Sequence, residues 1–173
     1  PVGVVVYPIR NSHLRLIDES GPVDWMSSTQ PPQRTHYDFR SDYTELTAGD
    51  SLCLYQYLTT QPSPGTQINV VLYGKAFRQN QLGVALEFTR DGTPKRFEAY
   101  HSGNGEWEDV ICAGRIADDV DTNSIRVSIF SQSDDKPICI RSITAEAVDR
   151  IVEPDLVYTL SFQAKNLNSF DHL

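Results

Sequence analysis

The chain has few of the residues and motifs on which most catalytic and metal sites depend. It has three cysteines, Cys53, Cys112 and Cys139, and none belongs to a C-x-x-C pair, which argues against a zinc ribbon or a thioredoxin-type centre. We expect all three to be buried in strands as small apolar residues. The histidines show no metal-site spacing, and the chain contains no G-x-S-x-G elbow, P-loop or G-x-G-x-x-G motif. The common hydrolase, nucleotide-binding and zinc-dependent classes are therefore disfavoured.

Positive charge and long apolar runs are also scarce. The chain has 15 Lys and Arg against 23 Asp and Glu, which gives a net charge of -8. Nucleic-acid binding needs clustered cations, and a membrane span needs about 20 apolar residues, so we expect neither partner. No segment has the composition of a signal peptide. A start at Pro1 rather than Met is typical of a fragment of a longer protein, and an extracellular or cell-surface location is expected if that parent is secreted.

Short apolar segments separated by turn sequences indicate an all-β chain. No window has the 3.6-residue period of a long helix, and Asp91-Gly92 is a typical turn. The expected strands are 2–7, 14–17, 52–59, 67–77, 83–89, 95–100, 107–113, 124–130 and 137–147, with a weak strand or turn over 37–46 and a Pro-rich loop over 20–36. We predict a two-sheet antiparallel β-sandwich, with one domain over 1–173, a core at about 40–149 and an extra strand at 156–162.

The order of three sequence features resembles a known family. Residues 52–58 read Leu-Cys-Leu-Tyr-Gln-Tyr-Leu, and a Gln-Pro-Ser-Pro-Gly-Thr corner leads into Ile-Asn-Val-Val-Leu-Tyr. Gly-Glu-Trp at 105–107 then opens a later strand. This order resembles the carbohydrate-binding modules of the galactose-binding-like jelly-roll type. The resemblance implies a jelly roll, a glycan ligand held in a cleft on one sheet, and a Trp107 that packs in or beside the core.

Alternation within the strands predicts which side chains face outward. If Ile68, Val70 and Leu72 point into the core, Tyr73 and Lys75 point out, and the same argument applies to the other strands. The outer face so predicted carries Tyr55, Tyr57, Tyr73, Lys75, Glu87, Arg126, Phe130 and Arg141. Aromatic rings cover the C–H faces of a sugar, and charged groups hydrogen-bond its hydroxyls. The predicted ligand-binding residues are Tyr73, Lys75, Arg126, Phe130, Tyr55, Glu87, Gln56 and Trp25.

Two of these eight residues carry a second interpretation. Gln56 alternates with Tyr55 and Tyr57, so the pattern puts it with the core residues. Trp25 lies in the Pro-rich loop, where a packing role and a ligand-binding role are equally consistent with the sequence.

The sequence implies no organic or redox cofactor, and a structural calcium ion is doubtful. The resemblance implies calcium bound by an Asp-Asp pair near the last strand, but Arg141 and Ser142 stand at the matching positions. Asp118, Asp119, Asp121 and Asn123 could supply oxygen ligands. They lack the Gly and Glu of an EF-hand loop, so a solvated acidic turn is favoured.

The sequence favours a non-catalytic carbohydrate-binding module that brings an attached catalytic domain to a polysaccharide. The alternative is a protein-interaction or structural accessory domain, suggested by the Pro-rich loop and the extra strand at 156–162. The third hypothesis is a glycan-cleaving enzyme that uses a carboxylate pair such as Glu106 and Glu108. Binding of a glycan array, copurification of a partner and a reducing-end assay separate the three.

Overall fold

The computed structural model describes residues 2–19, 21–28, 35–48, 51–132 and 136–150. The strands are β1 (Val2–Tyr7), β2 (Ile17–Asp18), β3 (Gly21–Pro22), β4 (Met26–Ser27), β5 (Thr35–Phe39), β6 (Thr44–Ala48), β7 (Leu52–Tyr57), β8 (Gln67–Lys75), β9 (Leu82–Arg90), β10 (Thr93–Tyr100), β11 (Trp107–Arg115), β12 (Val120–Ser131) and β13 (Ile138–Arg150). The described residues form no helix, and hence none that could cross a membrane. The strand predicted over 156–162 lies outside the described residues.

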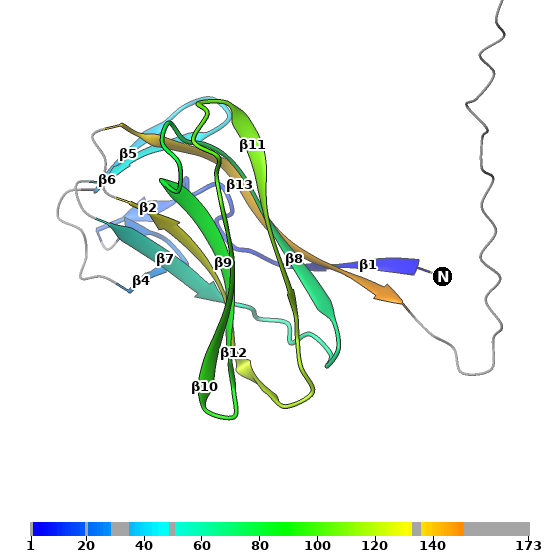
Figure 1. Cartoon of the computed structure of the whole chain (residues 1–173). Helices are drawn as coiled ribbons and strands as arrows, with labels where there is room; N and C mark the ends of the chain where they lie inside the picture. The colour runs from blue at the N-terminus through cyan, green and yellow to red at the C-terminus, as the bar shows by residue number, and fades with distance from the viewer. Residues whose placement is uncertain (1, 20, 29–34, 49–50, 133–135, 151–173) are drawn as a thin grey trace, which may run out of the picture.

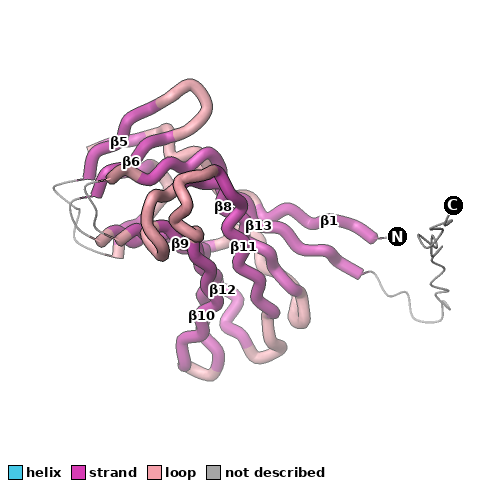
Figure 2. The backbone as a smooth tube through the Cα atoms, turned by 45° about the horizontal axis from the view of Figure 1, so that its top comes forward, coloured by secondary structure: helices cyan, strands magenta, loops and turns pink. Residues whose placement is uncertain are grey.

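Two antiparallel sheets pack face to face (Figures 1 and 2). The six-stranded sheet has the order β11-β8-β13-β6-β5, with β1 paired to the far end of β13. The five-stranded sheet has the order β10-β9-β12-β7-β4, and β2 and β3 form a small separate ribbon. In both figures β1 and the end of β13 extend together beyond the sandwich. The predicted all-β sandwich is therefore confirmed.

The core lies between the sheets and follows the predicted alternation. Ile68, Val70 and Leu72 of β8 are fully buried. Ile125 and Val127 of β12 are equally buried on the facing sheet. Removing such aliphatic side chains from water is the main stabilising contribution to a sandwich, and it determines which side of each strand remains outside.

The N-terminal third departs most from the sequence-based expectation. The weak strand at 37–46 is a hairpin of β5 and β6, whose partners run from Thr35↔Ala48 to Phe39↔Thr44. The expected loop at 20–36 contains β3 and β4, and Met26 of β4 pairs with Tyr55 of β7. Pairing with the longer β7 creates β4, and pairing with the equally short β2 creates β3, so neither strand leaves a period in the sequence.

Two of the three cysteines are buried as expected, and Cys53 is not. All three are free, Cys112 and Cys139 are buried, and Cys53 is half-buried. Burial raises the pKa of the Cys112 and Cys139 thiols, so both remain protonated and unreactive at neutral pH.

Candidate functional site

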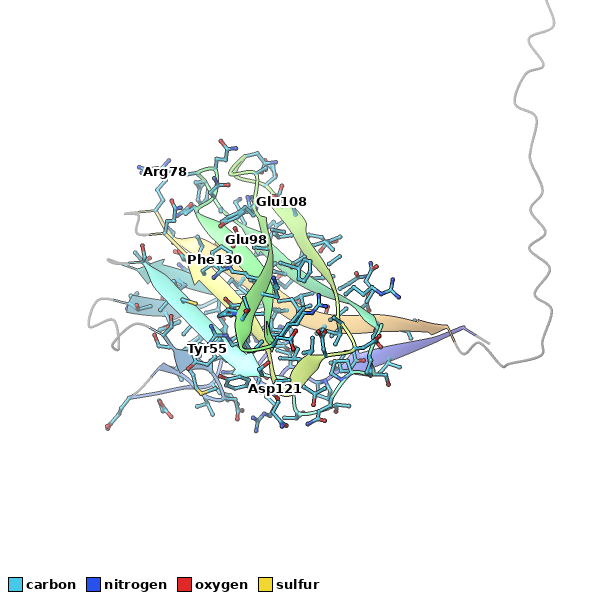
Figure 3. All side chains as sticks on the ribbon, turned by 60° about the horizontal axis from the view of Figure 1, so that its bottom comes forward. Tyr55, Arg78, Glu98, Glu108, Asp121 and Phe130 are labelled. Carbon is cyan, nitrogen blue, oxygen red and sulfur yellow. The ribbon has the colours of Figure 1, made fainter. Side chains whose placement is uncertain are left out.

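A row of polar and aromatic side chains crosses the outer face of the five-stranded sheet. Strand pairing places Arg126 of β12 beside Tyr57 of β7 on one side and Glu87 of β9 on the other. Arg96 of β10 lies opposite Glu87 and ends the row. Figure 3 shows Tyr55, Phe130 and Glu98 on the same group of strands. We call Tyr55, Tyr57, Glu87, Arg96, Glu98, Tyr100, Arg126, Ser128 and Phe130 the tyrosine–arginine face.

Glu87 is the centre of a charge network on this face. Its carboxylate accepts hydrogen bonds from Arg126 Nε at 2.8 Å and from Arg96 Nη1 at 3.0 Å, and also from the Ser128 hydroxyl. Only 13% of the Glu87 side chain is exposed. Arg96 Nε also donates to Glu98 at 2.6 Å. Charge-assisted bonds in a partly buried setting hold these groups in one arrangement.

The guanidinium groups also cover two of the rings. Arg126 Cζ lies 4.5 Å from the centroid of Tyr55, and Arg96 Cζ lies 4.7 Å from that of Phe130. Both distances are within the range of a cation–π interaction. Tyr55 and Phe130 therefore support the arginines, and their covered faces are not open platforms for a sugar.

Two further rings on this face remain open. Tyr57 is 42% exposed and Tyr100 is 40% exposed. Tyr100 meets Phe130 edge-on, with ring centroids 5.2 Å apart, and its hydroxyl donates a hydrogen bond to Glu98 Oε1 at 3.0 Å. Tyr57 makes the corresponding edge contact with Tyr55 at 5.9 Å. Each open ring is thus held in place by the covered ring beside it.

Two pKa shifts show how the network fixes protonation states. Partial burial lowers the pKa of Arg126, but the hydrogen bond and charge of Glu87 raise it more, and the balance is above its ordinary value. Partial burial and the hydrogen bond to Glu98 raise the pKa of the Tyr100 phenol. Both groups therefore remain hydrogen-bond donors at neutral pH.

Tyr73 and Lys75 do not belong to this face, so the prediction of a single face is wrong. Both lie on β8, in the six-stranded sheet, whereas Tyr55, Glu87 and Arg126 lie in the five-stranded sheet. Each residue points outward as predicted, but the two sheets have opposite outer faces. Arg141, which was predicted on the same face, lies with Tyr73.

The outer face of the six-stranded sheet has its own aromatic cluster. The ring centroid of Trp107, at the start of β11, lies 5.4 Å from that of Tyr73. It lies 5.3 Å from the centroid of Tyr43, a residue of the β5–β6 hairpin that meets the indole edge-on. Arg141 lies across the rings of both Trp107 and Tyr73. We call these four residues the tryptophan face. Trp107, expected in or beside the core, is half-buried on this outer surface.

Gln56 and Trp25 point inward and are not placed to contact a ligand. Gln56 is 2% exposed, and its amide exchanges two hydrogen bonds with the backbone of Arg10, at 2.8 and 3.0 Å. Trp25 is 8% exposed and donates its indole N–H to the Asn11 carbonyl at 3.2 Å. These buried polar groups anchor the N-terminal segment to the sandwich and satisfy their hydrogen bonds there.

The sequence-based prediction missed Arg96, Glu98 and Tyr100. All three lie on β10 and alternate with Phe97. The ring centroid of Phe97 lies 5.9 Å from that of Phe88, which belongs to the core. The same period-2 rule that selected Tyr55 and Arg126 could have found them.

The acidic turn at 118–121 forms an ion pair with β9. Among the described residues, no group of His, Cys, Asp or Glu has a metal-binding arrangement. Asp119 is paired with Arg90 at 2.8 Å, and the Arg90 hydrogen bond lowers the pKa of the Asp119 carboxyl. The two residues line an open cavity of about 540 Å³ at one end of the sandwich.

Comparison with solved structures identifies the fold. A family 4 carbohydrate-binding module (CBM4) superposes with a TM-score of 0.57 at 15% identity, over 81% of this chain and 99% of that one. The fold is a carbohydrate-binding-module jelly roll. The CBM22-1–GH10 modules of Clostridium thermocellum xylanase 10B, complexed with xylohexaose, give 0.56 at 10% identity, over 91% of this chain and 30% of that one.

The same fold also occurs within an enzyme of another kind. The enzymatically active domain of the bacteriophage CBA120 tailspike protein 4 gives a TM-score of 0.59 at 10% identity, over 83% of this chain and 21% of that one. No protein-family model matches the chain, and no curated protein matches it either. At these identities the similarity to the jelly-roll modules establishes the fold, and the argument for function depends on the residues of the two faces.

Proposed function

We propose that this jelly-roll domain binds a polysaccharide chain, without cleaving it, across the tyrosine–arginine face. The observation that carries the proposal is the pair of exposed rings, Tyr57 and Tyr100, at opposite corners of one hydrogen-bonded network. Rings open on one side are suited to the C–H faces of pyranose units, and the polar groups between them are suited to hydroxyls.

The spacing of the two rings suits an oligosaccharide rather than a single sugar. The row from Tyr57 to Arg96 crosses four strands, and three strand spacings amount to about 14 Å. Tyr100 lies four residues further along β10, which adds about 13 Å in the perpendicular direction. A ligand that reaches both rings therefore contains several sugar units.

The charges on the face favour a neutral glycan. Arg96 and Arg126 are balanced by Glu87 and Glu98, so the network has no net charge. The hydrogen bonds that fix these side chains exist before any ligand binds. A preorganised site loses less conformational entropy on binding, which favours affinity for a ligand with matching hydroxyls.

The same network argues against cleavage. A glycosidase needs one carboxylic acid to protonate the leaving oxygen and a second carboxylate on the other side of the bond. Glu87 and Glu98 are the carboxylates of this face, and both are engaged by Arg96. Neither is free to transfer a proton to a ligand. The xylanase similarity supports a role beside an attached catalytic module, since that structure joins a jelly-roll module to a GH10 module.

The test is isothermal titration with xylohexaose, cellohexaose and mannohexaose against wild type and a Tyr57→Ala/Tyr100→Ala variant. Loss of two stacking contacts is expected to weaken binding of the preferred hexaose by about tenfold or more. Phe39→Ala is the matched control, because Phe39 is a half-exposed ring on β5, away from the face. Unchanged affinity in the tyrosine variant would remove this face from the site. A reducing-end assay on the bound polysaccharide is expected to show no new ends.

A further inference from the structure

We propose that the tryptophan face is a second saccharide-binding site, so that one domain can hold two glycan chains on opposite sides. This inference extends the proposed function, but it uses no residue of the tyrosine–arginine face. It rests on the geometry of Trp107, Tyr73, Tyr43 and Arg141.

The rings of this face form a continuous aromatic surface. Trp107 and Tyr73 are inclined at 38° with ring centroids 5.4 Å apart, so the two rings form a tilted, partly overlapping pair. Tyr43 approaches Trp107 at 68° from the tip of the β5–β6 hairpin and forms a wall at one end. Arg141 lies across part of these two rings, so a pyranose on this face would stack on the ring area beside the guanidinium, next to the Tyr43 wall.

Arg141 is the hydrogen-bonding group of this surface. A β-bulge between Ile140 and Ser142 turns its side chain onto the rings, with Cζ 4.8 Å from Trp107 and 5.3 Å from Tyr73. Bulges that redirect a side chain are common beside binding sites. One guanidinium nitrogen, Nη2, donates to Asp42 of the hairpin.

One further donor of Arg141, its Nε–H, has no partner among the residues that the structure describes. Its Nε is buried, and among the described residues no acceptor lies within hydrogen-bonding distance of it. The Asp42 ion pair and the Tyr43 contact explain how the hairpin tip is held, but neither satisfies this N–H group. A hydroxyl or ring oxygen of a sugar on Trp107 and Tyr73 would supply the missing acceptor when the guanidinium shifts to meet it.

The surface continues along the strands beyond the rings. Asp109 of β11 lies opposite Tyr73, and Ile111 lies opposite Val71. Asp109 is exposed and can accept hydrogen bonds from hydroxyls, and Ile111 is 56% exposed. This strip extends the binding surface from the rings toward the other end of β8.

The two sites are far enough apart to act independently. Their residues lie on opposite outer faces of a sandwich whose sheets are about 10 Å apart, so a ligand on one face does not touch the other. Two sites on one domain increase avidity for a polysaccharide that presents many chains, and they allow one domain to bridge two chains.

Tryptophan fluorescence tests the second site directly. The chain has two tryptophans, and Trp25 is buried and hydrogen-bonded to Asn11, so a ligand-induced change reports on Trp107. We expect xylohexaose, cellohexaose or mannohexaose to change the emission. Tyr57→Ala/Tyr100→Ala is expected to keep this change at the wild-type midpoint. Arg141→Met, which retains an unbranched apolar stem, is expected to weaken it by about fivefold or more.

The outcomes separate the two proposals. Wild-type binding with no fluorescence response, or complete loss of binding in Tyr57→Ala/Tyr100→Ala, would overturn the second site and leave the first. Two results together would support the second site and remove the first. The fluorescence response would be lost in Arg141→Met, and the fluorescence and calorimetric titrations of Tyr57→Ala/Tyr100→Ala would both match wild type. Calorimetric stoichiometry is expected to approach two hexaoses per chain. Absence of binding by any hexaose or its parent polysaccharide overturns both proposals. Thermal unfolding of each variant checks that its fold is intact.

Discussion

The two outer faces of the sandwich carry similar residues in different arrangements. On the tyrosine–arginine face, Glu87 joins two arginines into a balanced network, and the open rings lie at its corners. On the tryptophan face, Arg141 pairs with the exposed Asp42, and the rings of Trp107 and Tyr73 lie together beneath it. The first is suited to a long neutral chain, and the second to a shorter contact around one indole.

The difference shows how a small change in backbone geometry changes a surface. The row on the five-stranded sheet follows from regular pairing, since Tyr57, Arg126 and Glu87 lie opposite one another in register. Arg141 reaches its rings through a bulge, which moves one residue out of register. The first face is therefore fixed by the strand ladder, and the second depends on local contacts of the β5–β6 hairpin.

The largest expected effect comes from Gly83→Ala, which should disrupt the tyrosine–arginine face alone. A Cβ at Gly83 would lie 2.2 Å from Phe130 Cε2 and 3.0 Å from the Ala99 carbonyl oxygen, so the Phe130 ring, which Arg96 covers, must shift. We expect a loss of about 1–3 kcal/mol in the free energy of unfolding, measured by urea denaturation. Hexaose affinity of this face should fall, while the Trp107 response remains.

Gly92→Ala is the control for that substitution. It lies in the β9–β10 turn with φ of +70° and has no atom within 4 Å of the added Cβ. It reports backbone strain without moving Phe130, so its binding should resemble wild type. Equal binding by the two variants would show that the position of Phe130 does not matter.

Removal of the carboxylate that pairs with the arginines of each face is expected to cost no more stability than Gly83→Ala. Glu87→Ala leaves Arg96, Arg126 and Ser128 without their shared acceptor in a partly buried setting, and should cost about 1–3 kcal/mol of stability. Asp42→Ala breaks an ion pair whose acid is 53% exposed, and should cost between about 0 and 1 kcal/mol. Thermal and urea unfolding of both variants measure the difference. A larger loss for Asp42→Ala would reverse the comparison of the two faces.

The fold and about half of the candidate tyrosine–arginine face could be predicted from the sequence. Period-2 alternation correctly turned Tyr55, Arg126 and Tyr73 outward, because burial of Leu54, Ile125 and Leu72 fixes the other side of each strand. The order of hairpin signals and strands was sufficient for the jelly roll. The sandwich class and the outward direction of a side chain are properties of local pattern, which a single sequence contains.

The assignment of strands to sheets could not be predicted in the same way. Alternation is identical for a residue on either sheet, so Tyr55 and Tyr73 were grouped although they lie on opposite surfaces. The hydrogen-bond partner of the Gln56 amide could not be predicted either, because it is the backbone of Arg10, 46 residues away in the sequence. Long-range pairing and a bulge such as that at Arg141 are set by tertiary structure, which the local pattern does not record.

The smallest expected effect concerns pH and the loop before Trp107. Partial burial alone would raise the pKa of Glu108, but hydrogen bonds from the Ser102 N–H and hydroxyl, with the nearby His101, lower it below 4.5. A carboxyl group whose pKa is lower in the folded than in the unfolded chain stabilises the fold at pH values above its ordinary, unfolded pKa. This contribution is lost as the pH falls through the lower pKa of the folded state. Acid titration of tryptophan emission should therefore show a transition below about pH 4.5 that is reduced in Glu108→Gln. Glu106→Gln, two residues earlier and exposed, should keep it. An unchanged transition in Glu108→Gln would mean that the tryptophan face owes its acid sensitivity to another group.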